Sequence, residues 1–149
     1  MRGGEGDPRI LGTVPRRPQK PRQLVADGRV YLWTLRHRHR TPEPGRYMNC
    51  RVTLTLYPQP AGTGGPLCIV FAEGPGRCLP CGAGAGSGDV GQVRDGRLNL
   101  HEPGAVRALL DAASAAGWRP GGRRSEVDGW PLLKVVAAAR AGTVHPSGP

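Results

Sequence analysis

Long apolar runs, aromatic residues and acidic residues are all scarce in this sequence. No apolar run approaches the about 18 residues that a membrane-spanning helix needs, and the first residues are basic and rich in Gly and Pro, unlike a signal peptide. We therefore expect a cytoplasmic protein with reduced thiols and no membrane partner. Only 7 of the 149 residues are aromatic, whereas 24 are Gly and 16 are Pro. Roughly 75–85 residues are left to pack, which predicts one domain with a modest core.

The shortage of acidic residues gives the chain a net charge of +10, and the excess is concentrated near the N-terminus. Residues 1–51 hold 12 Lys/Arg against 4 Asp/Glu, whereas residues 52–149 hold 9 against 7. We interpret residues 1–21 as a disordered basic leader, 22–141 as a single domain and 142–149 as a disordered tail. A basic arm favours polyanions such as nucleic acid. The alternatives are a solvated leader and the arginine preference of a high-GC bacterial genome.

Alternating and β-branched patterns predict an antiparallel sheet in the first half. Asp27-Gly28 is typical of a tight hairpin turn, and the following segment to residue 37 has strand composition. Residues 48–57 alternate apolar and polar, and Leu67–Ala72 is continuously apolar, as in a central strand. Residues 97–100 suggest a short last strand. The connections are predicted as loops, the longest of them Gly-rich: 41–45, 58–66 and 73–91.

The second half is predicted to be helical. Residues 102–116 carry apolar side chains at helical spacing, and Gly117 suits the C-terminal cap. Residues 128–140 are a candidate second helix, with a strand at 132–136 as the alternative. Together these patterns predict an α+β fold: a small antiparallel sheet of three to five strands packed on a C-terminal helix.

Two groups of residues in this pattern resemble a known type of protein. They are Val-x-Asp-Gly-x-x-Tyr-x-Trp at residues 25–33, and Val-Arg-x-Leu-Leu with Ala-Gly-Trp-x-Pro in residues 106–120. The combination is similar to a group of small, uncharacterised bacterial proteins, common in actinobacteria. The resemblance covers residues 22–120. It implies a few antiparallel strands followed by a helix ending in Gly-Trp-x-Pro, and it implies no catalytic activity.

The pair Cys78-x-x-Cys81 is the clearest chemical motif. Thiolates at this spacing can share one tetrahedral zinc ion, although no second pair follows at zinc-finger spacing. His37 and His39, or Cys50 and Cys68, are the available partners, but both cysteines fall in apolar strand patterns and are better interpreted as core residues. The Gly-rich residues after Cys81 do not begin a helix, which disfavours a thioredoxin-like redox site.

A basic cluster lies around the end of the second strand. It consists of Arg36, His37, Arg38, His39, Arg40, Arg46 and Arg51, with Tyr31, Trp33, Tyr47 and Tyr57 nearby. Arginines beside aromatic residues on a sheet are typical of single-stranded nucleic-acid binding. The alternative is an exposed strand end whose charges prevent aggregation.

No acid–base pair, nucleophile elbow or phosphate loop is recognisable, so the sequence gives no support for an enzyme. The leading interpretation is a non-catalytic binding or accessory module of a bacterium, acting on a protein partner or nucleic acid. The two alternatives are a nucleic-acid-binding protein that uses the basic N-terminal third and a small metal-binding protein that holds zinc at Cys78 and Cys81. We expect a monomer or small homo-oligomer, without a cofactor unless zinc is bound.

Overall fold

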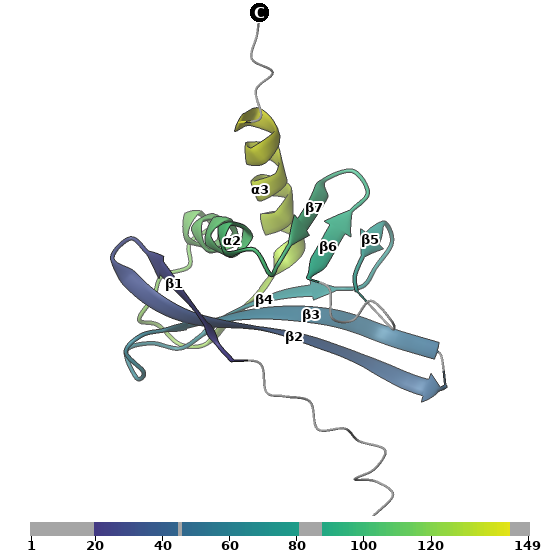
Figure 1. Ribbon diagram of the computed structural model, residues 1–149, viewed down its shortest axis with the longest axis horizontal. Helices are drawn as coiled ribbons and strands as arrows, with labels where there is room; N and C mark the ends of the chain where they lie inside the picture. The colour runs from purple at the N-terminus through teal and green to yellow at the C-terminus, as the bar shows by residue number, and fades with distance from the viewer. Residues whose placement is uncertain (1–19, 45, 81–87, 144–149) are drawn as a thin grey trace, which may run out of the picture.

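The computed structural model describes residues 20–44, 46–80 and 88–143, and within these ranges it confirms the α+β fold. A five-stranded sheet, a three-stranded sheet and two helices make up the described part of the chain. The elements are β1 (Arg22–Ala26), β2 (Arg29–Glu43), β3 (Arg46–Pro58), β4 (Leu67–Ala72), β5 (Arg77–Cys78), β6 (Asp89–Gln92), β7 (Gly96–Asn99), α2 (Pro103–Ala115), β8 (Ser125–Asp128) and α3 (Gly129–Thr143). Both helices and the small sheet lie on the same face of the main sheet (Figure 1).

The main sheet has the order β1-β2-β3-β4-β8. Its first four strands pair antiparallel in sequence order, as the sequence predicts. The fifth strand, β8, pairs with β4 in parallel, so the sheet is mixed. A parallel neighbour requires a long crossover, and here the connection contains α2. β8 was not predicted, because four residues with one apolar side chain carry too little pattern to mark a strand.

The β2–β3 hairpin extends further than the sequence suggests. The predicted loop at 41–45 is wrong at its start, because β2 runs to Glu43 and includes Pro42. Among the described residues, β1 pairs with β2 only as far as Trp33. Beyond Trp33 the outer edge of β2 makes no strand-to-strand hydrogen bonds there, so a proline, which lacks an N–H, is tolerated. The register shifts between Arg38 and Arg40, near Asn49 at φ 55°.

The small sheet occupies part of the predicted Gly-rich loop. β5 and the first three residues of β6 fall inside residues 73–91, so the prediction of a continuous loop is wrong, while residues 81–87 lie outside the described ranges. β7 confirms a short strand at the predicted place, but it is not the last strand, because β8 follows α2. The strands of this sheet have only two to four residues, and β6 and β7 contain glycine, so no alternation could reveal them.

Helix α2 confirms the strongest helix prediction. Its C-terminus is a Schellman motif: Trp118 N–H donates to Ala113 O at 3.0 Å and Gly117 N–H donates to Ser114 O at 3.1 Å. Gly117 adopts φ +114°, which a side chain would strain. The motif turns the buried Trp118 indole back onto Tyr31, with ring centroids 6.4 Å apart.

Helix α3 confirms the second helix and excludes the strand alternative at 132–136. Asp128 Oδ1 accepts the Trp130 N–H at 3.1 Å, which caps the first turn. Trp130 Nε1 donates to Ala72 O at 2.8 Å, and its ring meets Phe71 edge-on at 5.1 Å. These contacts fix the start of α3 against the end of β4. Neither this helix nor α2 is long and apolar enough to cross a membrane, in a search confined to the described residues.

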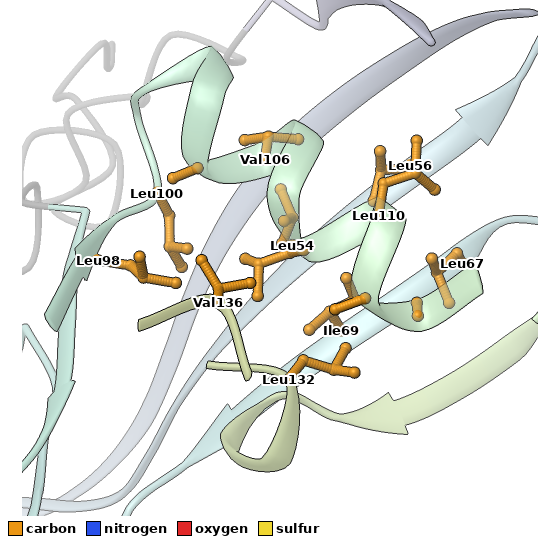
Figure 2. Packing of buried hydrophobic residues seen from close by; sticks show 14 of the residues in the cluster. Leu54, Leu56, Leu67, Ile69, Leu98, Leu100, Val106, Leu110, Leu132 and Val136 are labelled. Carbon is orange, nitrogen blue, oxygen red and sulfur yellow. The ribbon is translucent and has the colours of Figure 1, made fainter. Parts of the chain in front are cut away.

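The core lies between the main sheet and the two helices. Leu54, Leu56 and Ile69 point from the sheet toward Val106 and Leu110 of α2 (Figure 2). Leu132 and Val136 of α3 and the β7 region complete the cluster. Leu35 of β2 is half-buried and packs against the margin of this cluster.

The Asp128 cap gives a first testable prediction. Asp128→Ala removes the acceptor of the Trp130 N–H, and we expect it to lower the free energy of unfolding by about 1 kcal/mol. Asp128→Asn retains an oxygen at the same position and should keep most of the stability. Urea denaturation of both variants measures the difference. Equal stability of the two would contradict the capping role.

Candidate nucleic-acid interface

The main sheet has one covered face and one face that no described element covers (Figure 1). On β2 and β3 the buried side chains pair across the strands, as with Trp33 opposite Leu56. Because side chains alternate along a strand, the intervening residues project to the other side. We call this side the open face. Its members between Val30 and Arg40 of β2 and between Arg51 and Tyr57 of β3 are Val30, Leu32, Thr34, Arg36, Arg38, Arg40, Arg51, Thr53, Thr55 and Tyr57.

Four exposed arginines of the open face gather at one end of the hairpin. Arg38 lies directly opposite Arg51, and Arg36 is opposite Thr53, one step further along. Directly opposed side chains on neighbouring strands have Cβ atoms about 5 Å apart, and like charges there repel. Arg40 continues the row on β2 beyond the register shift. We refer to Arg36, Arg38, Arg40 and Arg51 as the open-face arginines.

Glu126 is the carboxylate that the structure places beside these arginines. Arg51 Nη2 lies 3.8 Å from Glu126 Oε1, and both side chains are about half exposed. The other oxygen of Glu126 lies 3.9 Å from Arg124 Nη2, so one carboxylate serves two arginines. Long, exposed ion pairs contribute little. The open-face arginines therefore keep a positive surface that water and salt can reach.

The structure separates the two histidines from the arginines. His37 and His39 lie on the covered face of β2, where His37 is opposite the buried Val52. Their rings are 5.1 Å apart and tilted by 48°. The prediction that placed them in one cluster with Arg36, Arg38 and Arg40 is wrong, because successive side chains of a strand point to opposite faces. Arg46, also predicted for the cluster, lies in β3, where its Cα pairs with Glu43 at the end of the hairpin.

The aromatic residues are divided in the same way. Tyr31 and Trp33 are 3% and 2% exposed and belong to the core, so they are no stacking platform. Burial raises the pKa of the Tyr31 hydroxyl, with Arg29 opposing, so the phenol stays neutral at physiological pH. Tyr57 is 41% exposed on the open face. Thr34 lies opposite Thr55, between Tyr57 and the arginines. These two threonines were not predicted from the sequence to belong to the site.

The cysteines only partly follow the expectation. Cys68 is a buried free thiol, as predicted, whereas Cys50 is buried but disulfide-bonded rather than reduced. Cys78 is an exposed free thiol in β5, and Cys81 lies outside the described ranges. Among the residues that the structure describes, no group of three or more His, Cys, Asp or Glu could hold a metal ion. The zinc hypothesis for Cys78 and Cys81 thus remains a prediction from the sequence.

Comparison of the chain with protein-family models, with curated proteins and with solved structures found no match. The interpretation of the open face therefore depends on its own geometry and charge.

Proposed function

We propose that this protein is a non-catalytic binding module that holds single-stranded nucleic acid on the open face of its main sheet. The observation that carries the proposal is the placement of Arg38 opposite Arg51, with Arg36 and Arg40 on either side, on a face that no described element covers. Such a cluster opposes folding of the hairpin through repulsion. An anionic ligand offsets that repulsion.

The shape of the cluster favours a linear polyanion over a small ion. Arg36, Arg38 and Arg40 recur at every second residue of β2, so their attachment points are about 7 Å apart along the strand. A row of this kind can follow the phosphates of an extended chain. Each guanidinium also presents a donor fork that suits phosphate oxygens.

The remaining part of the open face favours single strands over duplexes. Beside the arginines, Thr34 and Thr53 supply hydroxyl donors, and the exposed Tyr57 supplies a ring on which a base can stack. Bases are accessible for stacking only when unpaired. No described helix projects from this face to enter a major groove.

The proposal predicts a specific loss of binding. The test variant replaces the open-face arginines together: R36Q/R38Q/R40Q/R51Q. Full-length protein is titrated into fluorescent random-sequence single-stranded RNA and DNA across a salt series, with anisotropy as the readout. We expect affinity to fall about ten-fold or more, and the slope of log K against log salt to decrease by about 3, since each neutralised phosphate contributes about 0.7 on single strands.

A matched control removes the same charge elsewhere: R94Q/R97Q/R123Q/K134Q, all at exposed positions off the open face. Both variants retain the basic N-terminal residues, so a contribution of the leader affects them equally. The open face is supported as the binding site if the control keeps the affinity and salt dependence of the unaltered protein while the test variant loses them. Equal loss in both would contradict a defined site. Absence of binding by the unaltered protein would also contradict the proposal and leave an acidic protein segment as the partner to examine.

A further inference from the structure

A second candidate site lies at the edge of the main sheet, where β1 begins beside β2. It is a pocket of about 220 Å³ lined by Lys20, Arg22, Trp33, Thr34, Leu35 and His101. Lys20 and Arg22 come from the start of the described chain, the next three residues from β2, and His101 from the turn before α2. The fold thus brings together side chains that are up to 81 positions apart in the sequence.

One side of the pocket is cationic, and Arg22 is held in place there. Its guanidinium carbon lies 4.7 Å from the centroid of the Trp33 ring, and its Nη1 donates to His101 O at 2.6 Å. A guanidinium has five N–H donors, so this bond leaves donors for another acceptor. Lys20 adds a second positive charge on the exposed rim. Both charges favour an anion over a neutral ligand.

Trp33, one of the lining residues, has a donor without a partner. Trp33 is only 2% exposed, and its Nε1 is buried without an acceptor in the part of the chain that the structure describes. Buried indole N–H groups normally have a partner. Trp130 shows the usual arrangement in the same protein, since its Nε1 donates to Ala72 O. The Trp33 indole N–H therefore lies beside the pocket as a buried donor without an acceptor among the described residues.

We propose that this pocket binds a small organic carboxylate. Arg22 and Lys20 pair with its charge, and Leu35 contacts its apolar body, while the Trp33 ring beneath Arg22 senses the bound anion through that guanidinium. The planar fork of Arg22 suits a carboxylate. The apolar walls and few donors disfavour a phosphate dianion. The volume lies below the about 300 Å³ at which pockets for larger ligands begin, so the body attached to the carboxylate is small.

Two sources can supply this chemistry: a free organic acid, or the C-terminal carboxylate of a peptide. The two proposed sites share only Thr34, and the carboxylate site does not use the open-face arginines, because Arg22 and Trp33 belong to the covered side of the sheet. Either proposal can fail while the other stands.

The test follows the indole N–H signal of Trp33 in ¹⁵N–¹H spectra of the full-length protein, assigned by its loss in Trp33→Phe. Sodium benzoate is the probe, and sodium chloride at equal ionic strength is the reference. We expect a saturable shift with benzoate only. Arg22→Gln should weaken the apparent affinity about ten-fold, the usual effect of losing a charge-assisted hydrogen bond. Arg94→Gln, at an exposed position outside the pocket, should leave it unchanged.

Further titrations distinguish a free organic acid from the C-terminal carboxylate of a peptide. A short peptide with a free C-terminus that binds more tightly than benzoate, while its C-terminal amide does not bind, supports the proposal with a peptide as the source. Binding of benzoate alone supports a free acid. If Arg22→Gln disturbs the remaining spectrum, Lys20→Gln at the exposed rim takes its place, with weaker binding again expected. A shift that chloride reproduces, an affinity unchanged in the arginine or lysine variant, or tighter binding of inorganic phosphate would overturn the proposal.

Discussion

Replacing Gly129 with alanine is expected to lower the free energy of unfolding by about 2–3 kcal/mol, the upper part of the usual range for overpacking. A Cβ at this position would lie 2.6 Å from two ring carbons of Phe71 and 2.8 Å from a third. Phe71 is fully buried and its ring is held edge-on by Trp130, so it cannot move aside cheaply. The start of α3 would have to shift away from β4. Urea denaturation followed by tryptophan fluorescence measures the change.

Helix α3 provides the matched control. Gly142 lies in the same helix, and a Cβ there meets nothing within 4 Å. Gly142→Ala should be neutral or stabilise the protein by up to about 1 kcal/mol, because alanine is the better helix former. A loss of stability at Gly142 equal to that at Gly129 would show that the close approach to Phe71 is not the cause.

Leu54→Ala is expected to have the largest effect on stability, a loss of about 3–4 kcal/mol. Leu54 is fully buried in β3, between Leu35 of β2 and Ile69 of β4. It points toward the helices at the centre of the cluster (Figure 2). Truncation removes apolar contacts and leaves a cavity that strands fixed on both sides cannot close.

Val93→Ala is the control for this substitution. Val93 is 77% exposed in the turn between β6 and β7, so its truncation should change stability by less than about 0.5 kcal/mol. Chemical denaturation with a shared slope for all variants gives the comparison. A loss below about 1 kcal/mol for Leu54→Ala would contradict the central position of this residue.

Much of the fold was predictable because its signals are local. The Asp27-Gly28 turn, the alternation in β3 and the cap at Gly117 each depend on a few neighbouring residues, and the structure contains all three. β8 depends on a partner 58 residues away in β4, since Leu67 pairs with Ser125. No local pattern in a four-residue strand reports such a pairing, so it could not be predicted.

The candidate site was predictable to a similar extent. The arginines of β2 and Arg51 were identified from the sequence, and their common face follows from the period of a strand. The same period places His37 and His39 on the opposite face, which proximity in the sequence obscured. The carboxylate pocket could not be found, because Arg22 and His101 meet only through the tertiary fold.

The parallel pairing of β8 with β4 has a consequence for the synthesis of this protein. β4 is the most apolar strand, and until β8 and α3 leave the ribosome its outer edge is unpaired and Phe71 lacks Trp130. Exposed apolar edges of this kind recruit other chains. The nascent chain is therefore prone to aggregation from the synthesis of β4 until α3 has been synthesised and has folded onto it. A translational pause after residue 72 would lengthen this period.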